Sequence, residues 1–258
     1  APVFLYYPYV PGPTVAGQAR VLHVSEDQEE AARAAVGTSV VGDVGLAIRG
    51  LTELLPGEDR TPPPAQESPP EPEAGTPMSV EYVMHTIARV LPEDAAVFDE
   101  TASSKAKLHT YIRFNRPGGY HTSAAGGLGF CMPGSVGFKL AVPNRPVVCT
   151  IGDGSSMYSV QALWSAARYG ADVAFIVVNN RGYSILKGFR DAIGAGDRVP
   201  GLDVEGIDFV GVARGLGVDG ELVEEDVDLL PAVKRALNAG RPYLLEVMVD
   251  PEVPELLG

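Results

Sequence analysis

The chain is poor in basic residues and in cysteine, and it lacks long hydrophobic runs. Its 258 residues include 20 Lys and Arg against 33 Asp and Glu, so the formal net charge is −13. That charge argues against nucleic acid or an anionic membrane surface as a partner. No apolar run approaches the roughly 18 residues that a membrane-spanning helix needs. Only Cys131 and Cys149 are present, both in apolar contexts, which predicts buried thiols and a reducing, cytoplasmic location.

A nicotinamide-binding fingerprint is also missing. No G-x-G-x-x-G follows the first expected strand of either half of the chain, which disfavours a dinucleotide-binding Rossmann domain. What remains is ordinary globular composition, with 45% hydrophobic and 21% charged residues. The length allows one large domain or two smaller ones, each with a sizeable core.

Proline divides the chain into two unequal parts. Eight of the 22 prolines fall between Pro56 and Pro77, so residues 56–77 are expected to form an extended, solvated linker. Before it, residues 1–55 predict a strand, a helix, a second strand and a final helix. This βαβα piece is too small to form a stable domain alone, and it is expected to be the carboxyl-terminal part of a larger domain.

The part after the linker, residues 78–258, predicts a doubly wound parallel sheet. A helix is expected to begin at Ser79 and to carry one apolar stripe. Strands are expected near residues 96–98, 147–151, 173–178 and 243–249, alternating with helices. The predicted fold class is therefore α/β, and ligands on such sheets bind beyond the carboxyl ends of the strands.

Gly152-Asp153-Gly154-Ser155 follows one of these strands directly and opens a helix. A strand that ends in this way leaves backbone N–H groups free where an anion can bind. The Asp153 carboxylate would repel a phosphate unless a divalent cation lay between them, so the motif favours Mg²⁺ bridging carboxylate and diphosphate. The next strand ends in Asn179-Asn180, and an amide oxygen is a further hard ligand for such a cation.

The spacing of these two motifs resembles that of the thiamine diphosphate (ThDP) enzymes, whose signature is Gly-Asp-Gly followed about two dozen residues later by Asn-Asn. Here 24 residues separate Gly154 from Asn179. The resemblance implies that Asp153, Asn180 and the Gly182 carbonyl hold Mg²⁺. It also implies that Gly152, Gly154 and Ser155 lie at the diphosphate.

Further stretches resemble the benzoylformate decarboxylase branch of that family. They are Ala124 to Phe130 (AAGGLGF), Ala162-Leu163-Trp164, Val199 to Val204 (VPGLDV) and Gly206 to Phe209 (GIDF). The resemblance covers the whole chain apart from the linker, but only the carboxyl-terminal half of such an enzyme. It implies a 2-oxo acid substrate, an amino-terminal domain that this chain does not contain, and a tetramer with active sites between subunits.

The same resemblance assigns the other cofactor and substrate positions. Cofactor contacts are implied for Ser103, Gly126, Leu128, Tyr183 and Ile185, and a substrate pocket for Ala102, Leu186 and Phe189. Ordinary core packing remains the alternative for Leu128, Leu186 and Phe189, and a helix N-cap remains the alternative for Ser103.

Two departures from the branch concern the catalytic groups and the pocket. Tyr7 stands where these decarboxylases carry a histidine, and a phenol with a pKa near ~10 is a poor proton shuttle at neutral pH. Ala102 and Ile185 differ in size from the residues expected there, which leaves the identity of the 2-oxo acid open. His121 is a second weak candidate for a catalytic group, with a structural role as the alternative.

The sequence thus predicts a fragment of a ThDP- and Mg²⁺-dependent, non-oxidative 2-oxo acid decarboxylase, inactive without its amino-terminal half. In the family that the chain resembles, the glutamate that engages the cofactor's aminopyrimidine ring comes from that half in a neighbouring subunit. An acetolactate synthase-type carboligase and a non-catalytic ThDP-binding homologue remain the alternatives.

Overall fold

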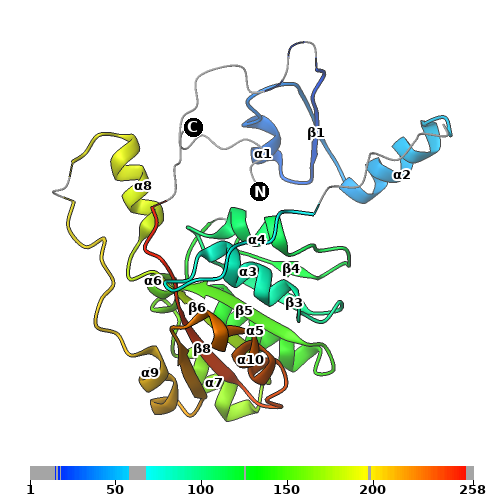
Figure 1. The fold of residues 1–258 in the computed structure, drawn as a ribbon. Coiled ribbons are helices and arrows are strands. Elements are labelled where there is room, and N and C mark those ends of the chain that lie inside the picture. The colour runs from blue at the N-terminus through cyan, green and yellow to red at the C-terminus, as the bar shows by residue number, and fades with distance from the viewer. Residues whose placement is uncertain are drawn as a thin grey trace. The chain divides into compact units, whose positions relative to one another are not determined.

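A computed structural model describes Val15, Gly17 and residues 19–57, 68–124, 126–196 and 199–253 of the chain. The chain divides into two compact units, residues 1–66 and residues 67–258 (Figure 1). All paired strands named below run parallel, so the predicted α/β class with parallel sheets is confirmed.

The described part of the first unit has the predicted βαβα order. Its elements are β1 (Leu22–Ser25), α1 (Gln28–Ala32), β2 (Thr38–Val41) and α2 (Val44–Leu54). Leu22 lies opposite Thr38 in the two-stranded pairing of β1 and β2. Asp27 accepts hydrogen bonds from the backbone N–H groups of Glu29 and Glu30, which explains why α1 begins directly after it.

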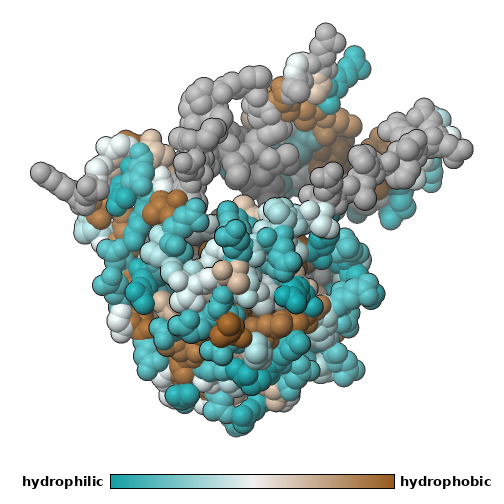
Figure 2. All heavy atoms as spheres, in the orientation of Figure 1, coloured by the Kyte–Doolittle hydropathy of each residue, from teal (hydrophilic) through white to brown (hydrophobic). Residues whose placement is uncertain are grey.

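This first unit leaves much of its apolar surface open. Helix α2 has no buried residue, and its Leu46 and Leu54 are 63% and 82% exposed. Leu22 and Val41 of the small sheet are also more than half exposed. Figure 2 shows hydrophobic residues gathered on the unit that carries β1 and β2. Two strands and two helices therefore do not enclose a core here.

The second unit contains a larger sheet and most of the helices. Its elements are α3 (Val80–Ala88), β3 (Ala96–Glu100), α4 (Lys105–Tyr111), β4 (Tyr120–His121), α5 (Cys131–Ala141), β5 (Val147–Gly152), α6 (Asp153–Ser156), α7 (Ala162–Tyr169), β6 (Ala174–Asn179), α8 (Ser184–Ala192), α9 (Phe209–Gly215), β7 (Asp219–Val223), α10 (Asp226–Leu237) and β8 (Tyr243–Met248). The six strands follow the order β4-β3-β5-β6-β8-β7.

Helices cover both faces of this sheet, because its central strands bury side chains on both sides. In β6, Phe175 and Val177 belong to a core cluster with residues of α5, α7 and α9. The alternate residues Ile176 and Val178 belong to a second cluster with residues of α3, α4 and α10. Each such fully buried side chain contributes about 1.5–3 kcal/mol. This double burial explains the unbroken apolar runs of β5 and β6.

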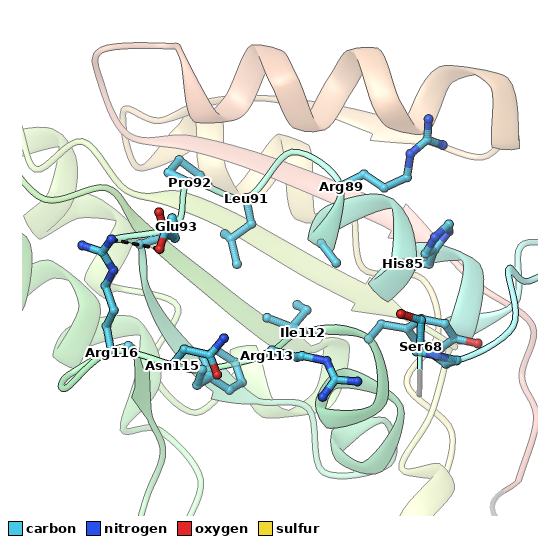
Figure 3. A pocket seen from close by; sticks show the side chains of 16 residues that line it. Ser68, His85, Arg89, Leu91, Pro92, Glu93, Ile112, Arg113, Asn115 and Arg116 are labelled. Carbon is cyan, nitrogen blue, oxygen red and sulfur yellow. Dashed lines mark ion pairs between the residues drawn. The ribbon is translucent and has the colours of Figure 1, made fainter. Parts of the chain in front are cut away.

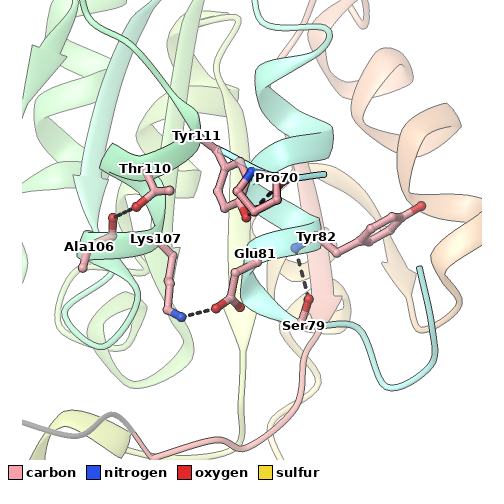
Figure 4. A network of polar contacts seen from close by, with 8 residues as sticks. All are labelled: Pro70, Ser79, Glu81, Tyr82, Ala106, Lys107, Thr110 and Tyr111. Atoms are coloured by element: carbon pink, nitrogen blue, oxygen red, sulfur yellow. Dashed lines mark hydrogen bonds and ion pairs between the residues drawn. The ribbon is translucent and has the colours of Figure 1, made fainter. Parts of the chain in front are cut away.

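Polar contacts join α3, α4 and the segment that precedes α3 (Figure 4). The Ser79 hydroxyl accepts the Tyr82 N–H and so caps α3, as predicted. Glu81 and Lys107 form an ion pair between α3 and α4. The Tyr111 hydroxyl lies 3.4 Å from the Pro70 carbonyl oxygen. The described end of the Pro-rich segment, residues 68–77, therefore belongs to the second unit and contacts α4, although most of its residues are exposed.

Candidate functional site

A cavity of about 520 Å³ lies in the second unit where β3, β5 and β6 end. Its lining comes from four short segments and a glycine: Thr101, Ala102, Ser103, Ser104, Gly126, Leu128, Gly152, Asp153, Gly154, Ser155, Tyr158, Val178, Asn180, Gly182, Tyr183, Ile185, Leu186 and Gly201. The volume is that of a site for a small-molecule ligand or cofactor.

The strand order explains why the cavity forms at this place. After β3 the chain adds β4 on one side, and after β5 it adds β6 on the other. The connections therefore diverge between β3 and β5, which leaves a crevice at the carboxyl ends of these neighbouring strands. Residues 101–104 follow β3, and residues 152–155 begin with the last residue of β5, so the two segments reach the cavity from opposite sides of this point.

The centre of the site is a pair of side-chain oxygens held by one backbone group. The Gly182 N–H lies 3.0 Å from Asp153 Oδ2 and 3.3 Å from Asn180 Oδ1. Asp153 Oδ1 accepts the Gly154 N–H at 2.7 Å. Asp153 and Asn180 are only 2% and 8% exposed. The two halves of the predicted motif are thus brought together, with carboxylate and amide oxygens side by side.

The two neighbouring asparagines have different structural tasks. Asn179 donates to Glu246 Oε1 at 2.8 Å and accepts the Arg181 N–H at 2.9 Å, so it fixes the turn that follows β6. Arg181 has φ of 60°, a left-handed conformation that is uncommon outside glycine and needs such support. Only Asn180 lines the cavity.

Burial dominates the electrostatics of Asp153. It raises the pKa of this carboxyl from 3.8 to about 6, while the N–H groups of Gly154, Gly182 and Arg181 act in the opposite direction. The positive charge of Lys187 also lowers this pKa, but desolvation outweighs these contributions, so the carboxylate remains costly to ionise. A divalent cation at this position would favour the ionised form.

Two glycines are required by close approaches at the site. A Cβ on Gly154 would collide with the Tyr183 ring, which packs directly over it. A Cβ on Gly182 would lie 2.8 Å from the Leu202 carbonyl oxygen. Only glycine permits both contacts without a shift of backbone or ring.

A second segment braces the turn from outside. The Tyr183 N–H donates to the Leu202 carbonyl at 2.8 Å, and the Val204 N–H donates to the Arg181 carbonyl at 3.0 Å. Lys187 of α8 pairs with Asp203 of this segment at 2.6 Å. We call Leu202–Val204 the strap. The second half of the Val-Pro-Gly-Leu-Asp-Val stretch thus holds the turn that carries the Asn-Asn motif.

Hydrogen bonds also order the wall that follows β3. The Asp99 carboxylate accepts the N–H and the hydroxyl of Thr101. The Ser103 hydroxyl accepts the Ile185 N–H at 2.9 Å and so joins this wall to the start of α8. Ser104, not Ser103, occupies the N-cap position of α4, and it makes no side-chain capping bond.

The structure brings together most of the site residues named from the sequence. Thirteen of them line the cavity: Ala102, Ser103, Gly126, Leu128, Gly152, Asp153, Gly154, Ser155, Asn180, Gly182, Tyr183, Ile185 and Leu186. Phe189, on α8, is not in this lining. Tyr7 lies outside the described residues. Sequence reasoning did not name Thr101, Ser104, Tyr158, Val178 or Gly201, which also contribute.

His121 is placed away from the cavity lining. Its ring stacks on Phe98 with centroids 4.4 Å apart, and its Nε2 lies 3.0 Å from the Gly118 carbonyl oxygen. Within the described part of the chain these contacts correspond to the structural role that was the alternative for this residue.

A second hollow lies near the start of β3, between α3 and α4 (Figure 3). Its lining includes Arg89, Arg113 and Arg116, whose side chains point in different directions. Arg116 pairs with Glu93. Because these guanidinium groups do not converge, this hollow is a weaker candidate for a functional site.

The described residues hold no group of three or more His, Cys, Asp and Glu side chains placed to bind a metal ion. A cation at the cavity would therefore need amide and carbonyl oxygens besides Asp153. Among the described helices, none is both long and apolar enough to cross a membrane.

Comparison with known proteins defines the class of this site. The family described as "Thiamine pyrophosphate enzyme, C-terminal TPP binding domain" matches residues 100–247, which include β5, β6 and every residue that lines the cavity. The chain belongs to this family of thiamine pyrophosphate (ThDP) enzymes.

Individual relatives agree with this assignment. A benzoylformate decarboxylase from Pseudomonas aeruginosa is 40% identical over 248 residues, which are 96% of this chain and 47% of the relative. An acetolactate synthase large subunit from Parasynechococcus marenigrum is 28% identical over 92% of this chain and 40% of its own length. A solved ThDP-dependent 4-hydroxybenzoylformate decarboxylase from Rhodococcus jostii RHA1 superimposes with a TM-score of 0.92 at 39% identity, covering 98% of this chain and 48% of that one. The chain thus spans about half the length of these relatives.

The residues around the cavity fit ThDP with a divalent cation. Asp153, Asn180 and the Gly182 carbonyl offer hard oxygen ligands of low total charge, which leaves coordination positions for phosphate oxygens. Gly152 and Gly154 carry no side chain that would block close approach of a diphosphate to the backbone. Leu128, Ile185 and Leu186 supply apolar surface in the same cavity.

Proposed function

We propose that the chain is the diphosphate-binding half of a Mg²⁺- and ThDP-dependent enzyme that decarboxylates a 2-oxo acid without oxidising it. The observation that carries this proposal is the Gly182 N–H shared between the oxygens of Asp153 and Asn180. It sets two hard ligands beside the helix start at Gly154, as a bridged metal and diphosphate would require. Benzoylformate-like substrates are favoured by the two decarboxylase relatives, each about 40% identical.

The roles proposed for the site residues follow their positions around the cavity. Asp153, Asn180 and the Gly182 carbonyl hold Mg²⁺, and Gly152, Gly154, Ser155 and Ser103 contact the diphosphate. Gly126, Leu128, Tyr183 and Ile185 bind and orient the organic part of the cofactor. Ala102 and Leu186 border the substrate, and Phe189 supports this pocket from α8. When bound, ThDP supplies the electron sink that loss of CO₂ from a 2-oxo acid needs.

The described residues leave proton transfer without an obvious agent. Only Asp153, Tyr158 and Tyr183 are titratable among the residues that line the cavity. Asp153 is assigned to the metal, and burial raises the pKa of Tyr183 above its ordinary value of 10. Tyr183 is therefore poorly suited to shuttle protons at neutral pH.

An additional half is the proposed source of the missing groups. The relatives are about twice as long as this chain, and the first unit exposes apolar surface on α2 and its small sheet. We propose that an amino-terminal domain, supplied within an oligomer of the complete protein, covers such surface and completes the active site. The chain by itself is expected not to turn over.

Calorimetric titration tests the cofactor part of the proposal. ThDP should bind with Mg²⁺, weakly or not at all without it, and Asp153→Ala should abolish the Mg²⁺-dependent binding. Binding that is equal with and without Mg²⁺, or equal in the variant, would contradict the assigned site. A normal circular dichroism spectrum of the variant controls for loss of fold.

A carboligase of the acetolactate synthase type is the second candidate, favoured by the synthase relative that aligns with 92% of this chain. It would share the cofactor site and differ in the fate of the decarboxylated substrate. Once the amino-terminal half is supplied, incubation with 2-oxo acids and product analysis separates the two. Release of an aldehyde indicates decarboxylation alone, whereas a 2-hydroxyketone or 2-hydroxy-2-alkyl acid indicates carboligation. ThDP binding without either product would indicate a non-catalytic homologue.

A further inference from the structure

Glu100 makes an unusual set of contacts at the end of β3. Its side chain is buried, with the residue 7% exposed. Oε1 accepts the Gly129 N–H at 2.7 Å, and Oε2 accepts the N–H groups of Phe130 and Cys131, each at 2.9 Å. One carboxylate therefore satisfies three successive backbone donors about thirty residues further along the chain.

Two of these donors, on Phe130 and Cys131, are free N–H groups at the start of α5, and the third lies on the residue before them. Helix starts carry such unpaired donors and a partial positive charge, and a side chain at the N-cap usually accepts from them. In α5 the N-cap residue is Phe130, whose side chain has no acceptor atom and makes no capping bond. The carboxylate of Glu100, at the end of β3, thus occupies the position that an anionic ligand or a local N-cap side chain would otherwise take.

The loop that Glu100 holds forms one wall of the cavity. Gly126 and Leu128 line the cavity just before Gly129, which itself has a φ of 96° and packs closely against Tyr158. Residues 101–104 line it directly after Glu100. The Glu100 carboxylate therefore joins two walls that come from distant parts of the sequence.

We propose that Glu100 is a positioning residue that fixes the loop of Gly126 and Leu128 where the organic part of the cofactor binds. This inference rests on the proposed function and deepens it. The diphosphate and metal end is held separately, because Asp153 and Asn180 are fixed by the Gly182 N–H at the ends of β5 and β6. Ser103 is joined to the start of α8 by the Ile185 N–H and not through the Glu100 carboxylate. Loss of the Glu100 carboxylate should therefore weaken recognition of the organic part and leave recognition of the diphosphate intact.

Two substitutions separate charge from size. Glu100→Gln keeps the volume but replaces one acceptor oxygen with an NH₂ group that faces backbone donors. Glu100→Asp keeps both acceptors on a shorter stem and should partly rescue the contacts. Glu221→Gln is the matched control, since this partly buried glutamate accepts from Arg235 and Tyr243 at β7, on the far edge of the sheet.

The experiment titrates the 258-residue chain and its variants with ThDP and with inorganic diphosphate, each with Mg²⁺. Glu100→Gln should bind ThDP about tenfold or more weakly than the unaltered chain, which corresponds to about 1.4 kcal/mol, with diphosphate affinity unchanged. Glu100→Asp should fall between them, and Glu221→Gln should match the unaltered chain. Hydrogen exchange of the amides of residues 129–131, measured without ligand, should accelerate in Glu100→Gln and less in Glu100→Asp.

Every other outcome contradicts either the positioning role of Glu100 or the proposed function on which that role rests. Equal weakening of both ligands would mean a general structural loss and overturn the positioning role. Unchanged ThDP affinity, or unchanged exchange of amides 129–131, would overturn it as well. If the unaltered chain binds neither ligand, the proposed cofactor function fails for this chain. The exchange measurement then still decides whether Glu100 holds the loop, and Glu100→Asp serves if Glu100→Gln does not fold.

Discussion

At the scale of single residues, Asp153 links the fold of the site to its electrostatics. The end of β5 buries this carboxyl, and burial raises its pKa to about 6. In the unfolded chain the same group titrates near the ordinary value of 3.8. Between these two pH values the folded state holds a proton that the unfolded state has lost. The stability of the metal-free chain should therefore fall as pH rises through this window.

We predict that Asp153→Asn removes this fall in stability with rising pH. A difference of about two pKa units corresponds to roughly 3 kcal/mol as an upper figure. Without divalent cations the variant should match the parent chain near pH 4 and be more stable by up to that amount above pH 6. Urea unfolding at several pH values, in the presence of a chelator, measures the difference. A variant equally or less stable at pH 7 would show that the ionised carboxylate costs little here. Added Mg²⁺ should stabilise only the parent chain.

Gly154 carries the second prediction at this scale. Because an added Cβ would collide with the Tyr183 ring, Gly154→Ala should destabilise the fold by about 1–3 kcal/mol. Removing the ring should relieve the clash, so the cost of Gly154→Ala should shrink markedly in a Tyr183→Ala background. Denaturant unfolding of the four proteins gives the coupling energy. Additive effects of the two substitutions would mean that the collision is relieved elsewhere than at the Tyr183 ring. Gly170→Ala is the control that reports backbone strain alone, because no atom lies within 4 Å of a Cβ at Gly170 but its φ is 64°.

Some of these residues could be predicted from sequence and others could not. Asp153 and Asn180 could be predicted, because each follows an apolar run and the spacing of their motifs is typical of a site for a metal and a diphosphate. Glu100 and Asn179 act through partners about 30 and 67 residues away, Cys131 and Glu246, which no local pattern reveals. His121 had no signal that distinguished stacking on Phe98 from catalysis.

At the scale of elements, the strap and α8 together hold the turn after β6. Two backbone hydrogen bonds join Leu202 and Val204 to Tyr183 and Arg181, and the ion pair between Lys187 and Asp203 closes the arrangement. Asp203 is largely exposed, so this pair is worth only about 0.2–1 kcal/mol. The ion pair therefore affects the site by restricting the backbone of the strap, and not only through its small contribution to the free energy of folding.

We predict that Asp203→Asn weakens Mg²⁺-dependent ThDP binding about two- to fivefold, because a looser strap lets the Gly182 carbonyl and N–H move. High salt should reduce the difference between variant and parent, since the pair is partly exposed. Asp191→Asn is the control, because it removes an exposed ion pair with Arg190 in α8 without touching the strap. Calorimetry measures both. Equal effects of the two variants would assign the change to general charge and not to the strap.

The elements themselves were predictable where burial is double-sided. β5 and β6 are continuous apolar runs because both faces are covered. The edge strand β7 contains Asp219, Gly220 and Glu221 and buries only Gly220 and Val223, so it has no continuous apolar run that would predict a strand. β4 has two residues, too few for a pattern. The helix expected to open at Gly152-Asp153-Gly154-Ser155 is only the short α6, and turns at residues 157–161 separate it from α7.

At the scale of the whole molecule, the two units differ in how well each encloses a core. The second unit has a hydrophobic cluster on each face of a six-stranded sheet and contains the entire cavity lining. The first unit has two paired strands and a helix without a buried residue. In the described part of a chain that spans about half of its relatives, the second unit thus encloses a core of its own and the first does not.

We predict that residues 67–258 fold alone and keep the cofactor site, whereas residues 1–66 do not fold alone. The shortened chain should melt cooperatively within about 4 °C of the 258-residue chain, because its core residues are retained. Its Mg²⁺-dependent affinity for ThDP should equal that of the full chain, and self-association should decrease as the apolar surface of α2 is removed. Circular dichroism melting, calorimetry and sedimentation velocity measure these three properties. A non-cooperative melt, or loss of ThDP binding with the fold intact, would show that the first unit supports the second directly. Adding residues 1–66 as a separate peptide would then restore the property that the truncation removed.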